Sequence, residues 1–234
     1  MKKYLSRISG CSAGEFLKRA EGSMKQGKKE FIITANPEIL MKAGKNPKIH
    51  DMILEHTVVP DGISVVKAMK KAGIPVIERI TGVDLVEGLL ESAGKQGLSV
   101  YLLGAKEEVV SDLVKQEAKK YPNAVYNYHN GYDGDKDLIF DEIKKLQPDL
   151  VIVGLGVPAQ ELLISRHLDG FEKGIFIGVG GSLDVLSGHK QRAPAFFIRT
   201  NTEWLYRLLR EPSRLSRFYE NNIKFMGEVS KSLK

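Results

Sequence analysis

Short apolar runs alternate with amphipathic segments between residues 30 and 180. The runs at 30–35, 98–105, 148–156 and 174–180 are apolar at most positions and have the length of strands. Between them, apolar residues recur at helical spacing, as they do in 81–97. Strands that are apolar on both faces and separated by helices are typical of a parallel sheet covered on both sides. The pattern therefore predicts an α/β fold with a mostly parallel, Rossmann-like sheet flanked by helices.

Capping residues mark the expected starts of several helices. Asn36 stands directly before a proline, an arrangement favoured at a helix N-terminus. Thr81 and Asp84 have the spacing of a capping box. The acidic segment 132–137 lacks the glycine and the glutamate that a calcium-binding loop needs at its sixth and twelfth positions. We therefore expect Asp135 to cap a helix, and we expect no structural metal.

The C-terminal part of the chain has a different character. From residue 201 onward it contains no strand-like run, and the pattern predicts two amphipathic helices broken at Pro212. A basic stripe accompanies the apolar one, and its members are Arg207, Arg210, Arg214 and Arg217. We predict an α/β domain over 1–195 and a C-terminal basic amphipathic appendage over 196–234.

Composition narrows the class of protein. The 234 residues are 42% apolar and 27% charged, which is typical of a folded globular protein. The sequence contains no apolar run of membrane-spanning length, and the basic start lacks the apolar core of a signal peptide. One cysteine, Cys11, excludes an internal disulfide framework and fits the reducing cytoplasm. The formal charge of +6 leaves nucleic acid, an anionic membrane and a phosphorylated substrate open as partners.

Glycines and polar residues follow several predicted strands. In parallel α/β sheets, ligands bind beyond the carboxyl ends of the strands. Gly104 ends one strand, and Gly180, Gly181 and Asp184 follow another in a segment that continues into a basic block, 189–192. Each glycine alone is explained by a tight turn, and the basic block by a solvated loop. The dinucleotide fingerprint is not completed at either glycine pair. Together, these strand ends favour a binding site for an anion.

Asp61 is the acidic residue that stands out, because it follows a short predicted strand. A carboxylate at that place could serve as a general base, although a turn aspartate explains it equally well. Thr34 and Asn36 lie at the neighbouring strand end, where they could join Asp61 or serve only as helix caps. Arg79 precedes a helix and is either an anion ligand or part of a surface ion pair.

Seven motifs, in order, resemble the WecG/TagA/CpsF family of bacterial glycosyltransferases over residues 32–218. The motifs are TANPEIL (34–40), PDGISVV (60–66), RITGVDL (79–85), YLLGA (101–105), VGLGVPAQE (153–161), GVGGSLDVLSGHKQRAP (178–194) and EWLYRLLREPSRLSRF (203–218). Seven ordered motifs are far more specific than any one glycine pair.

The resemblance implies a reaction. Within the family, the chain is most similar to members that transfer N-acetylmannosamine from UDP-N-acetylmannosamine to undecaprenyl-diphosphate-linked N-acetylglucosamine, in the synthesis of the wall teichoic acid linkage unit. It implies a β-1,4 linkage formed with inversion, without a metal or other cofactor, at the cytoplasmic face of the membrane. The expected partners are the UDP-sugar donor, the polyprenyl-diphosphate-linked acceptor and an anionic membrane surface, and not nucleic acid. We also expect homo-oligomers through the tail when no membrane is present.

The resemblance also implies roles for individual residues. Asp61 matches the general base, and Thr34 matches a position in the donor pocket. Arg214 and Arg217 match arginines that close over the pocket and stabilise the leaving diphosphate, which a transfer without metal requires. The expected substrate-binding residues are Asn36, Arg79, Gly104, Gln160, Glu161, Gly180, Gly181 and Asp184.

One position departs from the family pattern. Ala159 stands before the Gln-Glu pair, where family members often carry Lys or Arg. The change bears on the charge of the pocket and therefore on the donor sugar. UDP-N-acetylmannosaminuronic acid and UDP-glucose remain alternative donors. A non-catalytic basic module that binds membranes or nucleic acid is the alternative from another class, and it explains the tail but not Asp61.

Overall fold

A parallel six-stranded sheet forms the centre of the computed structural model, which describes residues 1–211 and 215–233, without the side chains of Arg207 and Arg217. The spatial order of the strands is β2-β1-β6-β5-β3-β4, and neighbouring strands run parallel to each other. The strands are β1 (Lys29–Ala35), β2 (Thr57–Pro60), β3 (Ser99–Gly104), β4 (Val125–His129), β5 (Leu150–Gly154) and β6 (Gly174–Gly178). The predicted fold class is confirmed.

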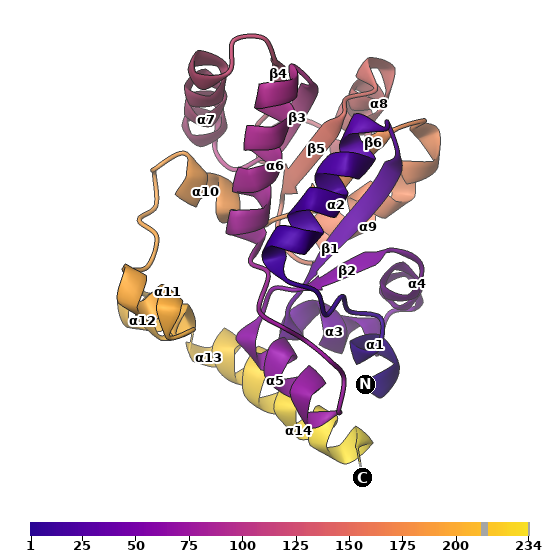
Figure 1. The fold of residues 1–234 in the computed structure, drawn as a ribbon, viewed down its shortest axis with the longest axis vertical. Helices are drawn as coiled ribbons and strands as arrows, with labels where there is room; N and C mark the ends of the chain where they lie inside the picture. The colour runs from indigo at the N-terminus through magenta and orange to yellow at the C-terminus, as the bar shows by residue number, and fades with distance from the viewer. Residues whose placement is uncertain (212–214, 234) are drawn as a thin grey trace.

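Helices cover both faces of this sheet (Figure 1). One face carries α2 (Ala13–Lys25), α6 (Gly82–Gln96), α7 (Glu107–Lys120) and α10 (Ser182–Leu186). The other carries α3 (Pro37–Ala43), α4 (Pro47–Glu55), α5 (Ile63–Lys71), α8 (Lys136–Leu146) and α9 (Ala159–His167). The short α1 (Lys2–Leu5) packs with this second group.

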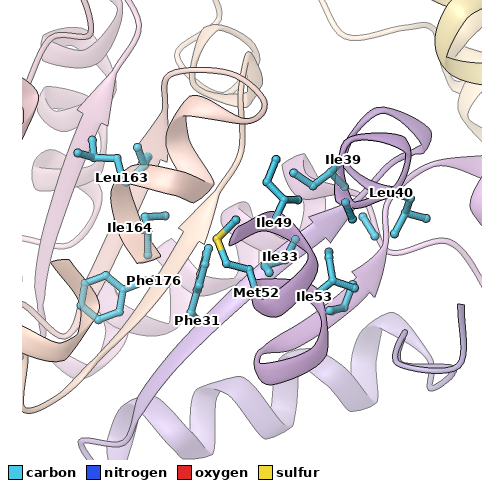
Figure 2. Packing of buried hydrophobic residues seen from close by; sticks show 14 of the residues in the cluster. Phe31, Ile33, Ile39, Leu40, Ile49, Met52, Ile53, Leu163, Ile164 and Phe176 are labelled. Carbon is cyan, nitrogen blue, oxygen red and sulfur yellow. The ribbon is translucent and has the colours of Figure 1, made fainter. Parts of the chain in front are cut away.

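Alternation along the strands divides the apolar core into two clusters. In β1, Phe31 and Ile33 face the cluster beneath α3 and α4, while Ile32 faces the cluster beneath α2 and α6. All three side chains are at most 2% exposed. Figure 2 shows the first cluster, in which Met52 of α4 lies near Phe31. Burial of apolar surface on both faces is what requires the continuous apolar strands seen in the sequence.

The predicted caps are confirmed at three helices. The Asn36 side chain accepts a hydrogen bond from the Ile39 N–H at 3.0 Å and so begins α3. Thr81 accepts one from the Asp84 N–H at 3.1 Å and begins α6. Asp135 caps α8, as the turn interpretation of 132–137 predicts. These caps fix where each helix leaves the carboxyl edge of the sheet.

The C-terminal segment contains α11 (Ala195–Arg199), α12 (Glu203–Arg210) and a run made of α13 (Leu215–Phe218), a π-helical turn (Tyr219–Ile223) and α14 (Lys224–Ser232). Pro212, the predicted break, lies outside the described residues. Figure 1 shows this run passing α5 and α3 at one end of the molecule. Phe225 and Val229 are fully buried in the same cluster as α3 and α5. The end of the tail is therefore part of the packed structure.

Candidate active site

Three strand ends lie side by side at the carboxyl edge of the sheet. β1 lies between β2 and β6, with Ala35 opposite Pro60 and Ile33 opposite Gly178. The helix that follows β1 packs on one face of the sheet, and the helix that follows β6 packs on the other. In α/β proteins, the carboxyl edge beside such a divergence is where ligands bind. The segments after β1, β2 and β6 are therefore the candidate site.

Asp61 lies at this edge of the sheet, immediately after β2. Its Oδ1 accepts a hydrogen bond from the N–H of Gly82, the first residue of α6, at 3.0 Å. Its own N–H donates to the Ala35 carbonyl oxygen at 3.0 Å. The helix N-terminus favours a negative charge at this position. The half-buried carboxylate is therefore held in one place.

Thr34 and Ser182 stand beside the same helix start. A Cβ atom added to Gly82 would lie 3.7 Å from the Thr34 methyl carbon and 3.6 Å from Ser182 Oγ. Thr34 is 5% exposed, and its hydroxyl donates to the Gly178 carbonyl oxygen at 3.0 Å. Ser182, which is buried at the start of α10, was not among the residues selected from the sequence pattern. Asn36 is half-buried nearby and caps α3. The structure thus brings Thr34, Asn36 and Asp61 together.

A buried glutamine joins the two glycine-rich loops that follow β5 and β6. Gln160 Oε1 accepts hydrogen bonds from the Gly156 N–H at 3.0 Å and from the Gly180 N–H at 2.9 Å. Its Nε2 donates to Glu161 Oε1 at 2.7 Å. Both side chains are 1% exposed. Gln160 therefore sets the relative position of the two loops, and Glu161 orients the Gln160 amide.

Burial raises the pKa of Glu161 to about 7, because a carboxylate inside the protein loses its hydration. The hydrogen bond from Gln160 acts in the opposite direction and is the weaker effect. Oε2 of Glu161 has no hydrogen-bond partner among the described residues. The pKa of Glu161 is consequently close to neutral pH.

The glycines of the strand ends differ in what they do. Gly104 has a φ of +140°, and a Cβ atom there would lie 2.6 Å from the Gly154 carbonyl oxygen. Gly104 is thus required where β3 and β5 approach each other. Gly180 has a φ of +50° with open space around it, and Gly181 directly precedes α10. The loop that contains Gly180 can therefore admit a ligand close to its backbone.

The basic block after α10 is engaged in ion pairs with acidic residues. Lys190 Nζ lies 3.4 Å from Asp184 Oδ1, and Arg192 Nη2 lies 2.6 Å from Asp84 Oδ1. His189 lies 3.1 Å from Asp112 and lowers the pKa of that carboxyl through a hydrogen bond. Arg192 connects this loop to the first turn of α6. The block therefore fastens the loop to α6 and α7.

The tail reaches the same edge of the sheet. Arg79, which lies between β2 and α6, forms an ion pair with Glu203, the first residue of α12. Asn221 donates to Glu38 at 3.2 Å, and Ser64 donates to Asn222 at 2.8 Å. These contacts join the tail to the segments that follow β1 and β2. The sequence pattern does not predict them, because the partners are more than 120 residues apart.

Arg214 lies outside the described residues, as does the side chain of Arg217. The predicted roles of both arginines stay predictions. Within residues 1–211 and 215–233, no three His, Cys, Asp or Glu side chains are grouped as metal ligands would be. In the same part of the chain, no helix has the length and apolar character needed to cross a bilayer.

Comparison with known proteins identifies the family. The pattern that defines the glycosyl transferase WecG/TagA/CpsF family matches residues 3–234. The chain belongs to this family. It is therefore a glycosyltransferase, which favours the enzyme interpretation over the non-catalytic module.

Two relatives of this glycosyltransferase carry the name N-acetylglucosaminyldiphosphoundecaprenol N-acetyl-beta-D-mannosaminyltransferase. The one from Bacillus spizizenii strain W23 is 40% identical over 195 residues, which are 82% of this chain and 76% of that protein. The one from Staphylococcus aureus strain MW2 is 38% identical over 204 residues, 86% of this chain and 80% of that protein. The similarity extends over most of both proteins.

Proposed function

We propose that the protein transfers N-acetylmannosamine from UDP-N-acetylmannosamine to N-acetylglucosamine on undecaprenyl diphosphate. The product would be the β-1,4-linked disaccharide of the wall teichoic acid linkage unit. The relatives support this proposal, because their name states both sugars and the polyprenyl carrier. The observation that carries it here is the Asp61 carboxylate, held at the start of α6 beside the carboxyl ends of three neighbouring strands.

In the proposed mechanism, Asp61 removes the proton from the acceptor hydroxyl as that oxygen attacks the anomeric carbon of the donor. The attack comes from the face opposite UDP, so the new bond has the inverted configuration. The bond from the anomeric carbon to UDP breaks, and UDP leaves with the bonding electrons. The proton remains on Asp61 until solvent removes it. The Asp61 carboxylate is fixed by the Gly82 N–H, so its side chain does not need to change position before it accepts the proton.

We propose further that the transfer proceeds without a metal ion or other cofactor. The leaving diphosphate then needs positive charge and hydrogen-bond donors from the protein. The loop around Gly180 and Gly181 can approach the diphosphate with its backbone, and Gln160 holds that loop in place. Arg214 and Arg217 supply the charge in this proposal. Thr34 and Asn36 contribute to the donor pocket.

The tail is proposed to hold the enzyme on the inner face of the cell membrane. Among the described residues of the tail, the exposed large apolar side chains are Phe196, Trp204, Leu205, Leu209, Leu215, Tyr219 and Ile223. Exposed Arg199 and Arg210 stand among them. Apolar side chains beside arginines suit a surface of anionic lipid. The acceptor resides in that membrane, and without it the same surface would support self-association.

Release of UDP tests the proposed reaction. Purified protein is supplied with a lipid-diphosphate-linked N-acetylglucosamine analogue, EDTA and one of three donors: UDP-N-acetylmannosamine, UDP-N-acetylmannosaminuronic acid or UDP-glucose. The proposal predicts acceptor-dependent release with the first donor alone. Release with one of the other donors would reassign the donor and connect it with the change at Ala159. Release that requires an added divalent metal would contradict the proposal of a transfer without metal.

A further inference from the structure

A largely buried ion pair between Arg79 and Glu203 joins the tail to the segment that follows β2. The two side chains are 12% and 9% exposed, and they are 124 residues apart in the chain. Glu203 was not among the residues that the sequence pattern selected. Removing one partner of such a buried ion pair destabilises a protein more than removing one partner of an exposed pair does. The remaining charge is left without water or a counter-ion.

Arg79 stands on a rigid part of the molecule. The N–H of the next residue, Ile80, donates to the Pro60 carbonyl oxygen at 2.9 Å, directly before Asp61. Thr81 then caps α6. The Arg79 backbone is therefore tied to the end of β2 on one side and to the start of α6 on the other. A partner that pairs with Arg79 acquires a fixed position next to Asp61.

Glu203 stands where the tail turns into α12. The Thr202 and Thr200 hydroxyls are hydrogen bonded to each other at 2.7 Å in the turn before it, and the helix follows at once. The next residue, Trp204, stacks on Phe218 of α13 with 4.6 Å between the ring centroids. Fixing Glu203 thus fixes the start of α12 and, through the stacked rings, its position relative to α13.

We propose that Glu203 is a positioning residue. By pairing with Arg79, it holds the start of α12 at the carboxyl edge of the sheet beside Asp61, and through the stacked Trp204 and Phe218 rings it sets the position of α12 relative to α13. It follows that Arg79 contributes to activity through the tail and not as a direct ligand of the diphosphate while this ion pair is formed. The catalytic consequence rests on the proposed function, whereas the docking of the tail does not.

The first experiment measures docking without any substrate. Trp204 is the single tryptophan of the chain, so its quenching by acrylamide reports on the start of α12. In Glu203→Gln, Arg79 loses its counter-ion and no longer holds α12. We therefore expect acrylamide to quench Trp204 faster than in the wild type. Tryptic cleavage after Arg199 and Arg210 should be at least about tenfold faster. The matched control is Glu220→Gln, which removes the same charge from an exposed intrahelical pair with Lys224. It should behave as the wild type.

A second variant covers the case in which Glu203→Gln is misfolded. The exchange Arg79→Glu with Glu203→Arg restores an ion pair of opposite polarity and should return the quenching and the cleavage rate toward the wild-type values. Quenching and cleavage in Glu203→Gln that equal those of the wild type would overturn the proposal. An exchange variant that is no better docked than Arg79→Glu alone would also overturn it.

A kinetic experiment distinguishes a positioning role of Glu203 from a role in the overall stability of the fold. In Glu203→Gln, kcat for sugar transfer should fall at least about tenfold while the circular dichroism spectrum stays that of the wild type. An undocked tail with unchanged kcat would overturn the positioning role. If the wild-type protein transfers no sugar at all, the proposed function fails, and the quenching result still decides whether Glu203 docks the tail.

Discussion

The Gln160 amide donates a hydrogen bond to the Glu161 carboxylate at 2.7 Å, and both side chains are almost completely buried. This bond determines which way the amide points. Its oxygen then faces the two loops, where it accepts from the N–H groups of Gly156 and Gly180. Adjacent residues of one helix thereby control the spacing of two loops that arise from different strands.

Gln160→Glu should damage this arrangement more than Glu161→Gln does. The first change removes the Nε2 donor and places two carboxylates side by side in a buried site, so we expect a loss of about 2–4 kcal/mol in the free energy of unfolding. The second retains an oxygen that can accept from Gln160, and it should cost less. Urea unfolding compares the two. Equal losses would show that the orientation of the Gln160 amide does not depend on Glu161.

The unfolding free energy should depend on pH through Glu161. Its pKa in the folded protein is raised from 4.5 to about 7, so the folded state binds the proton more tightly than the unfolded state. The stabilisation from this group is complete below pH 4.5 and decreases as the pH rises to about 7. The difference corresponds to about 3 kcal/mol.

Glu161→Gln provides the comparison, because it removes this titration and leaves the other ionisable groups in place. The unfolding free energy of the wild type relative to the variant should fall between pH 4.5 and pH 7. Parallel profiles over this range would contradict the raised pKa.

Two glycine substitutions should separate packing from binding. In Gly104→Ala, the new methyl group would collide with the Gly154 carbonyl, so we expect destabilisation by about 3 kcal/mol or more and a lower Tm. Gly180→Ala has open space and should cost only about 1–2 kcal/mol for its positive φ. We nevertheless expect Gly180→Ala to bind UDP more weakly in calorimetry, because the methyl group occupies the approach to the loop. UDP affinity equal to that of the wild type would exclude the loop from the donor site.

Membrane association should depend on the exposed apolar side chains of the tail. The double variant Leu209→Ser, Leu215→Ser should bind vesicles of anionic phospholipid at least about tenfold more weakly in a sedimentation assay. Val125→Ser, Leu138→Ser is the matched control, because these side chains are similarly exposed but lie on β4 and α8. An equal reduction by both pairs would show that binding is not localised to the tail.

Local features of the sequence predicted the fold well. Caps such as Asn36 and Thr81 act within a few residues of themselves, and strands buried on both faces are apolar throughout, so both leave a clear pattern. The helix α4 was not predicted from the pattern. Long-range contacts such as Arg79 with Glu203 have no local signature, because the fold alone brings these residues together.

For the candidate site, the sequence predicted which residues lie near one another but not their contacts. The rule that ligands bind beyond the carboxyl ends of parallel strands predicted that Asp61 and Thr34 lie close together, and they do because β1 and β2 are neighbours in the sheet. It could not show that Gly82 holds the carboxylate or that Gln160 joins two loops, because side-chain direction is decided by packing. The chemical roles of these residues stay predictions.

Asp61→Asn tests the central proposal most directly. Asparagine keeps an oxygen that can accept from the Gly82 N–H, so the fold and UDP binding should remain as in the wild type. It cannot take a proton from the acceptor, and kcat should therefore fall by about 10²–10⁴. Glu87→Gln is the matched control, because it neutralises an exposed acid on the same helix.

The decisive measurement is UDP release from UDP-N-acetylmannosamine and the lipid-linked acceptor, with UDP affinity determined on the same samples. We predict that Asp61→Asn binds UDP normally and releases almost none by transfer, while Glu87→Gln turns over as the wild type does. Near-normal turnover by Asp61→Asn would contradict the assignment of Asp61 as the general base.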